Sequence, residues 1–201
     1  MGITKVFHDK VVYDRRMERL ADILSGVIAD DCSTILDVGC GDGQIDANIM
    51  SRKKGVVIHG IDVLERKKTM IPVQIYDGVN IPLEENSVDG VLLVDMLHHT
   101  DDPESVFSEC LRVSKRYIII KDHVLWGGIS RIKLKVMDYV GNNHYGVRMP
   151  YNYLTNQQWE SLFEKNSLIV EEYISNLYLY KGLFHLLFDG KLHFVARISK
   201  G

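Results

Sequence analysis

The chain has 201 residues, a net charge of −3 and 46% hydrophobic residues. These values are ordinary for a globular protein of one domain, and the slightly acidic balance argues against a protein that mainly grips a phosphate backbone. Its three cysteines are widely spaced, which disfavours a disulfide framework and a cysteine-rich zinc site. No signal-like N-terminus or membrane-length apolar run is evident, so the sequence predicts a soluble, cytoplasmic protein.

The first predicted element is a helix, because apolar residues between Met17 and Ile28 recur at spacings of three and four. Short β-branched apolar runs then alternate with helical stretches. The predicted strands cover residues 34–38, 56–62, 73–76, 88–94 and 117–120, and the predicted helices cover residues 44–53, 64–69 and 103–113. Such alternation predicts a doubly wound α/β sheet whose strands are mostly parallel.

The last quarter of the chain has a different pattern. Thr155 and Gln158 fit a capping box, so a helix is predicted from there to about Lys165. Residues 168–175 and 192–198 are then predicted to be two strands, with no helix between them. We expect this pair to be antiparallel and to lie at one edge of the sheet.

A glycine-rich loop, Asp37-Val38-Gly39-Cys40-Gly41-Asp42-Gly43, follows the first predicted strand and opens a helix. Alternate glycines let backbone approach a ligand, and the helix N-terminus offers unpaired N–H groups. The spacing departs from the dinucleotide pattern GxGxxG, because Gln44 stands where its third glycine would be. Asp37, Asp42 and Asp46 would repel a pyrophosphate and suit a ligand with a cationic amine and a sulfonium. The alternative is a glycine-rich turn without a ligand.

Two further carboxylates end the next strands. Asp62 ends the second strand, where a carboxylate can accept hydrogen bonds from ribose hydroxyls, and it precedes Val63. Asp77 and Gly78 end the third, where Asp77 could accept from an adenine amine. Either aspartate could instead be an ordinary turn residue.

In this order and at this spacing, the motifs resemble those of class I S-adenosylmethionine-dependent methyltransferases, in particular the broad type 11 family of mostly small-molecule enzymes. The resemblance covers residues 35–121, under half the chain. Besides the glycine loop and Gly60-Ile61-Asp62, it includes Asp77-Gly78, the stretch from Ile81 to Val91, and Leu97-His98-His99 followed by Asp102-Pro103. The family often has Phe at the positions of Leu83 and Val88, and the Asn/Asp-Pro-Pro-Tyr element of base methylation is absent.

The resemblance implies a Rossmann-like sheet of seven strands, mostly parallel, with an antiparallel C-terminal hairpin at its edge, and S-adenosyl-L-methionine as cofactor. It implies that Asp37 and the loop hold the methionine part, that Asp62 and Val63 lie at the ribose, that Asp77 and Gly78 lie at the adenine, and that Val94 and Asp95 face the methyl group. The cofactor-binding residues expected in full are Asp37, Gly39, Cys40, Gly41, Gly43, Asp62, Val63, Asp77, Gly78, Val94 and Asp95.

Three histidines are candidate catalytic bases. His98 and His99 follow the fourth strand, and His123 follows the fifth, at the edge where open α/β sheets bind ligands. Each of them could instead be a structural hydrogen-bonding residue. Their spacing matches no known zinc pattern, so no metal is expected.

The substrate is expected to be selected by the segment from Trp126 to Tyr153, which combines an apolar helical stripe with a polar loop. The candidate substrate-binding residues are His144, Tyr145, Tyr151 and Tyr153. The aromatic segment 177–188 could cap a pocket, form a dimer contact, touch a membrane or pack on the sheet. Lys181 and Lys191 are its nearby basic residues, which disfavours the membrane interpretation.

The sequence therefore predicts one methyltransferase domain over residues 1–201. Its expected parts are an N-terminal helical segment (1–33), a cofactor-binding core (34–122), a lid (123–154), and a C-terminal helix with the edge hairpin (155–201). The predicted reaction is in-line transfer of a methyl group to a small, hydrophobic or aromatic molecule, by a monomer or homodimer. The alternatives are methylation of protein or RNA, an NAD(P)-dependent oxidoreductase, and a non-catalytic S-adenosylmethionine-binding module.

Overall fold

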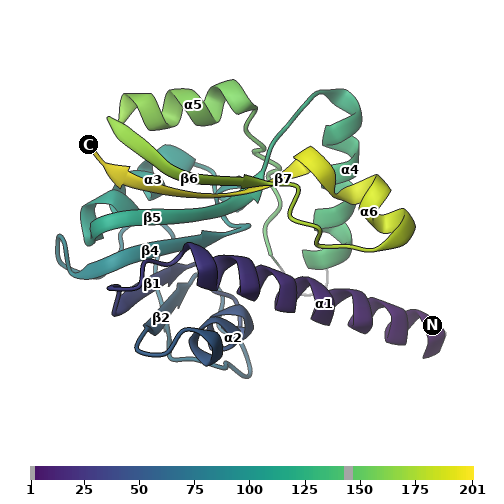
Figure 1. The fold of residues 1–201 in the computed structure, drawn as a ribbon, viewed down its shortest axis with the longest axis horizontal. Helices are drawn as coiled ribbons and strands as arrows, with labels where there is room; N and C mark the ends of the chain where they lie inside the picture. The colour runs from purple at the N-terminus through teal and green to yellow at the C-terminus, as the bar shows by residue number, and fades with distance from the viewer. Residues whose placement is uncertain (1–2, 143–146) are drawn as a thin grey trace.

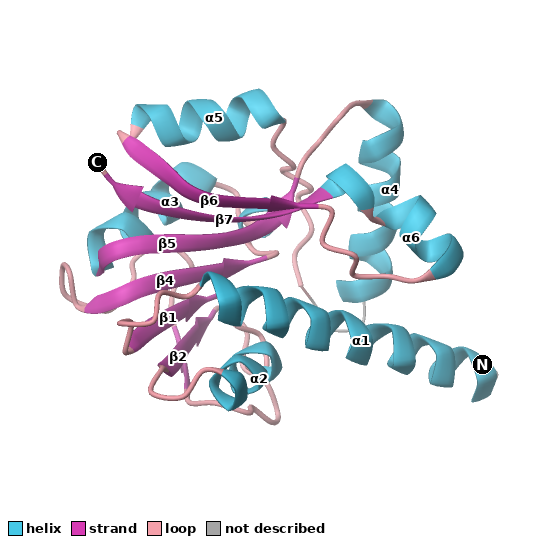
Figure 2. Cartoon of the chain, viewed as in Figure 1, coloured by secondary structure: helices cyan, strands magenta, loops and turns pink. Residues whose placement is uncertain are grey.

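A computed structural model describes residues 3–142 and 147–201. Seven strands form one sheet in the order β3-β2-β1-β4-β5-β7-β6, with helices on both faces (Figures 1 and 2). The strands are β1 (Thr34–Val38), β2 (Val57–Asp62), β3 (Val73–Ile75), β4 (Val88–Val94), β5 (Ser114–His123), β6 (Leu168–Ser175) and β7 (His193–Lys200). The helices are α1 (Ile3–Val27), α2 (Gln44–Arg52), α3 (Pro103–Val113), α4 (Gly128–Asn142), α5 (Asn156–Lys165) and α6 (Gly182–Phe188), with 3₁₀ turns η1 (Leu97–His99) and η3 (Gly190–Leu192).

The strand directions confirm the predicted fold class. Strands β1 to β5 pair in parallel, as in the register Leu36↔His59 and Leu36↔Val91. β7 is antiparallel to both of its neighbours, β5 and β6, so the C-terminal pair closes this side of the sheet with β6 as the edge strand. The carboxyl ends of β1, β2, β4 and β5 consequently lie along one edge, where α/β sheets bind their ligands.

Two apolar layers hold the sheet. On one face, α1 and α2 bury residues such as Leu24 and Ile49 against alternate positions of the central strands. On the other, α3 and α5 bury Phe107 and Trp159 against the remaining positions. Because both faces are covered, the central strands are apolar almost throughout, which is why their sequences are near-continuous hydrophobic runs.

The two capped helices begin where the sequence predicts. Asp102 accepts a hydrogen bond from the backbone of Ser105 at the start of α3, and Pro103 is in its first turn. Thr155 and Gln158 form the full capping box at the start of α5.

Two helix predictions are wrong. Residues 64–69 form turns rather than a helix, because Leu64 donates to the Asp62 carboxylate and the chain then runs back to the glycine loop, where the Met70 N–H bonds the Asp42 carbonyl at 2.7 Å. The second wrong prediction concerns α6, which forms where the sequence predicted no helix. It has only seven residues and is apolar on every side, so it shows no amphipathic period.

Among the described residues, none of the helices combines the length and the hydropathy needed to cross a bilayer.

Candidate functional site

The glycine loop is held at the carboxyl ends of β1 and β2. Gly39, Gly41 and Gly43 all have positive φ angles, of 80°, 62° and 72°, which other residues rarely adopt. The Gly39 N–H bonds the Ile61 carbonyl at 2.8 Å, and the Gly41 N–H bonds Asp62 Oδ2 at 2.8 Å. A Cβ atom added to Gly41 would meet no atom within 4 Å, so this part of the loop faces open space. The loop can therefore let a ligand approach its backbone.

Cys40 contributes only its backbone to the surface of this loop, because its side chain points into the protein. A Cβ atom on Gly60 would come within 2.3 Å of Cys40 Sγ, so the thiol fills the space that Gly60 leaves. Burial raises the pKa of this thiol, which is therefore a packing group rather than a nucleophile.

Asp37 and Asp46 form an acidic pair beneath the loop. Asp37 Oδ1 and both carboxylate oxygens of Asp46 are buried, and outside the pair no side chain of the described residues donates a hydrogen bond to them. Burial, and then the charge of Asp46, raise the pKa of Asp37 well above its usual range, and burial raises the pKa of Asp46 to about 7. Unsatisfied buried carboxylates of this kind favour a cationic ligand nearby, as the predicted amine and sulfonium require.

The predicted ribose and adenine residues lie together at the ends of β2 and β3. Asp62 is almost buried, and its two oxygens accept the N–H groups of Gly41 and Leu64, both at 2.8 Å. A Cβ atom on Gly78 would lie 3.0 Å from Val63, so these two positions are neighbours. Asp77 is exposed and accepts hydrogen bonds from Val79 and Asn80, as an ordinary turn residue does. These hydrogen bonds lower the pKa of Asp77 and keep it ionised.

At the end of β4, Val94 is half-buried and the Asp95 carboxylate forms ion pairs with Arg16 of α1 and Lys121 of β5. Lys121 is completely buried. Burial would raise the pKa of Asp95, but the charges of Lys121 and Arg16 outweigh it and hold the pKa well below its usual range. Asp95 therefore ties α1 to the sheet instead of presenting a free carboxylate.

His98 lies between two carboxylates and is 2% exposed. Its Nδ1 is 2.6 Å from Asp122 Oδ1, and its Nε2 is 3.3 Å from Asp138 Oδ2. Burial lowers the pKa of His98, but Asp122 and then Asp138 more than compensate and raise it to about 10. The side chain is thus a buried imidazolium at neutral pH, which is a poor general base.

The other two candidate bases are neutral. Burial, and then the charge of His98, lower the pKa of His99 to about 4, and burial followed by Lys121 lowers the pKa of His123. His99 Nδ1 is 3.1 Å from the Arg148 carbonyl, an oxygen that can only accept, so Nδ1 carries the proton and Nε2 the lone pair. His99 is half-buried, whereas His123 is 4% exposed.

The structure brings the three histidines together with two of the four predicted substrate residues. The His98 ring centroid lies 4.1 Å from that of His99, 4.8 Å from that of His123 and 5.3 Å from that of Tyr153. The Tyr153 hydroxyl donates to Asp138, and Tyr153 is buried within the cluster. The ring centroid of Tyr151 lies 6.1 Å from that of Tyr153. His144 and Tyr145 lie outside the described residues.

Two sets of side chains have their ligand atoms within 4.8 Å of one another, His98 with Asp122 and His123, and His98 with His99 and Asp138. Such sets can in principle hold a divalent cation. Both ring nitrogens of His98 face carboxylates, so a cation would have to displace a proton from this ring.

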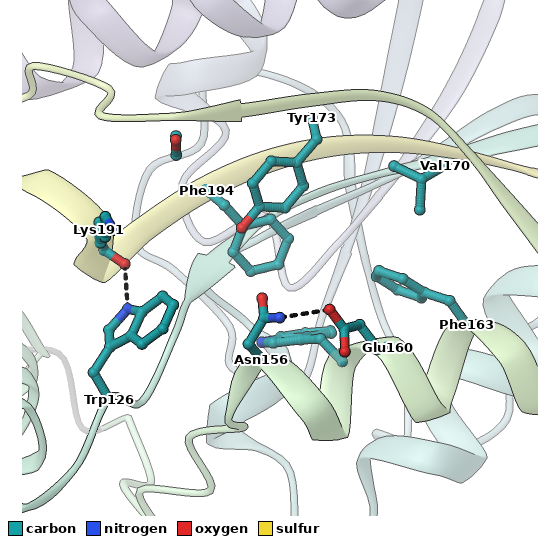
Figure 3. A pocket seen from close by; sticks show the side chains of 10 residues that line it. Trp126, Asn156, Glu160, Phe163, Val170, Tyr173, Lys191 and Phe194 are labelled. Atoms are coloured by element: carbon teal, nitrogen blue, oxygen red, sulfur yellow. Dashed lines mark hydrogen bonds between the residues drawn. The ribbon is translucent and has the colours of Figure 1, made fainter.

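A pocket of about 380 Å³ lies beside this cluster, between α5 and the last two strands (Figure 3). At one end, the Trp126 indole donates to the Lys191 carbonyl at 2.7 Å, and Asn156 pairs with Glu160 near its middle. Trp159, which also lines it, donates to the His123 carbonyl at 3.0 Å. Trp159 therefore connects the lining of this pocket to the backbone of the histidine cluster.

Sequence reasoning missed five residues of the cluster: Arg16, Lys121, Asp122, Asp138, and His193, whose ring centroid lies 4.9 Å from that of His123. Lys121 and Asp122 had a usable signal, because two charged residues directly follow a buried strand at its ligand-binding end. Arg16, Asp138 and His193 had none, since each comes from an element far away in the sequence.

Known proteins resemble this chain in sequence and in fold. Residues 36–117 match the Methyltransf_11 family, a methyltransferase domain. A ubiquinone biosynthesis O-methyltransferase of Pseudomonas fluorescens is 31% identical over 93 residues, which are 40% of this chain and 39% of that protein. The chain thus spans only about two fifths of the length of the curated relatives it matches.

Solved structures resemble the whole fold. A SAM-dependent methyltransferase from Aquifex aeolicus has a TM-score of 0.62 at 18% identity, with all of both chains covered. The PH0226 protein from Pyrococcus horikoshii has a TM-score of 0.68 at 17% identity, covering 94% of this chain and 91% of its own. The family match and this fold imply S-adenosyl-L-methionine as the cofactor. The match over residues 36–117 thus supports a class I methyltransferase of the type 11 family.

Proposed function

We propose that the chain transfers a methyl group from S-adenosyl-L-methionine to a hydroxyl oxygen of a small molecule. The observation that carries the proposal is that one sheet edge holds both the open glycine loop and, at the ends of β4 and β5, a cluster containing a neutral histidine. The relatives named as O-methyltransferases support an oxygen acceptor.

The cofactor supplies an already activated methyl group, so the protein mainly has to align the acceptor. Loop backbone and Asp62 would hold the nucleoside end, and the acidic Asp37–Asp46 pair would favour the cationic end. A cationic ligand next to this pair would also favour its ionised form.

His99 is the residue that we assign as general base. A hydroxyl must lose its proton as its oxygen forms a bond to the methyl carbon, while the carbon–sulfur bond breaks and its electron pair stays on sulfur. Neutral His99 can take that proton on Nε2, whereas His98 is already protonated. Burial, and then the charge of His98, lower the pKa of His99 and keep its ring neutral, so we assign His98, which Asp122 and Asp138 hold, as a positioning residue.

Two measurements test the proposal in sequence. Calorimetry with S-adenosylmethionine and S-adenosylhomocysteine should show binding, and no heat at millimolar ligand would contradict the assignment. Transfer of label from methyl-labelled cofactor into a fractionated metabolite extract should then identify an O-methylated product. Label found in a protein or RNA fraction would refute the small-molecule acceptor.

The role of His99 has its own test. His99→Gln should lower kcat by roughly 10²–10⁴-fold while cofactor affinity stays unchanged. His59→Gln is the matched control, because His59 is exposed on β2 away from the cluster. Equal activity of the two variants would remove His99 from the reaction.

A further inference from the structure

Helices α4 and α6 contact each other at one end of the molecule and leave large apolar side chains in solvent (Figure 1). On α4 these residues recur at spacings of three and four, as on the face of a helix that binds a partner. They are Ile129, Ile132, Val136, Tyr139 and Val140 on α4, and Leu183, Leu186 and Leu187 on α6. Ile129 is 76% exposed and Leu186 75%. A surface of this size requires an explanation, because single-chain proteins rarely expose such clusters.

Within the two segments that carry these rows, the exposed charged residues are all basic. The basic residues are Arg131, Lys133, Lys135, Lys181 and Lys191. Residues 126–141 and 177–192 contain two acidic residues, and both are buried. Asp138 accepts from Tyr153, and Asp189 accepts from the Tyr180 N–H at 3.1 Å. In these two segments, therefore, no described carboxylate is exposed beside the apolar rows.

We propose that α4 and α6 form a peripheral docking surface for a membrane that contains anionic lipids. Aliphatic and aromatic side chains flanked by lysine and arginine suit the boundary between headgroups and acyl chains, where both kinds of contact are favourable. A second copy of this chain is a poorer occupant, because a two-fold contact through this face would bring the same basic residues together. The residues of α6 alone show too little of the basic charge of this surface, because Arg131, Lys133 and Lys135 come from the neighbouring helix α4.

The same helices reach the candidate site from their inner sides. Asp138 of α4 contacts His98 and Tyr153, and the Phe188 carbonyl of α6 lies 2.8 Å from His193 Nε2. Docking would therefore place the site next to the bilayer. If the proposed function holds, the acceptor is an apolar hydroxylic molecule that partitions into lipid.

Vesicle co-sedimentation of the full chain tests the docking surface without cofactor or acceptor. Binding should be clear with phosphatidylcholine vesicles containing roughly one-third phosphatidylglycerol, weak with phosphatidylcholine alone, and reduced by salt. The double variant Ile132→Ser with Leu186→Ser should bind at least roughly tenfold more weakly. Val57→Ser with Ile169→Ser is the matched control, because these exposed residues lie on β2 and β6 and should not affect binding.

The charges are tested by Arg131→Glu with Lys181→Glu, compared with Lys54→Glu with Lys68→Glu on another part of the surface. Only the first pair should weaken binding to the anionic vesicles. Equal binding by the surface variants and their controls would overturn the proposal, as would a wild-type dimer in light scattering that the serine variant dissociates without any lipid binding. Vesicle binding by a chain that does not bind S-adenosylmethionine would refute the proposed function and leave the docking surface intact.

Discussion

The two ends of the candidate site, which the proposed function assigns to the cofactor and to the acceptor, are held by different interactions. At the cofactor end, backbone N–H groups of Gly41 and Leu64 bond to Asp62, and the loop bonds the neighbouring strand, so the geometry depends on short segments. At the acceptor end, side-chain charges of Arg16, Asp95 and Lys121 meet from three separate elements. The first arrangement depends on conformation and the second on a balance of buried charges, so the two ends should respond differently to mutation and to pH.

The largest effect is expected at the acceptor end, from Asp122→Ala. This change leaves the buried His98 imidazolium without its partner at 2.6 Å, and breaking a buried pair in this way costs about 3–5 kcal/mol of unfolding free energy. Urea unfolding measures the cost. Lys165→Ala, which removes an exposed ion pair with Glu104, is the control and should cost less than about 1 kcal/mol. Similar costs for both variants would mean that the cluster is not a coupled charge network.

The acidic pair gives the cofactor end one pH-dependent component. The pKa of Asp46 is raised from 3.8 to about 7, so the folded chain holds a proton that the unfolded chain releases. This contribution to stability is complete below pH 4 and is lost as the pH rises through about 7. Each pKa unit is worth about 1.4 kcal/mol, which makes the full loss at most about 4 kcal/mol.

Asp46→Asn should therefore reduce the fall in unfolding free energy between pH 4 and pH 8 in the ligand-free protein, and the part that remains should come from Asp37, whose pKa burial still raises. Chemical unfolding at several pH values checks this, with Asp30→Asn as an exposed control that should leave the slope unchanged. An undiminished slope in Asp46→Asn would show that other groups cause it.

The backbone-held part of the cofactor end is tested by Asp62→Ala. Charge-assisted hydrogen bonds contribute about 1.5–3 kcal/mol each, so losing this carboxylate should weaken S-adenosylmethionine binding at least tenfold. Calorimetry on a variant shown to be folded by circular dichroism gives the affinity, and Asp30→Ala provides the reference. Unchanged affinity would remove Asp62 from the cofactor site.

This contrast also explains what could be predicted from the sequence. Strands 34–38 and 88–94, helix 103–113 and the glycine loop depend on neighbouring residues, and the structure has them where they were predicted. The turns at residues 64–69 begin with a local contact between Asp62 and Leu64, but they also depend on the return of the chain to Asp42, which no local pattern shows. For His98, the sequence indicates a titratable group at the right edge, but its protonation depends first on Asp122 and then on Asp138, which lies 40 residues away in α4.

Helix α5 distinguishes the effect of local sequence from the effect of place in the fold. It lies at the acceptor end, but it begins with a capping box that can be predicted from the sequence. Thr155→Ala removes the cap on Gln158 and should cost about 1 kcal/mol in urea unfolding, while Thr155→Ser should restore most of it. Trp159 of this helix donates a hydrogen bond to the His123 carbonyl. If Thr155→Ala lowers only the unfolding free energy, then the local structure of α5 supports the acceptor end without determining the protonation of its side chains. A change in the pH profile of methyl transfer in Thr155→Ala would contradict that separation, because the capping groups carry no charge and lie outside the His98 network.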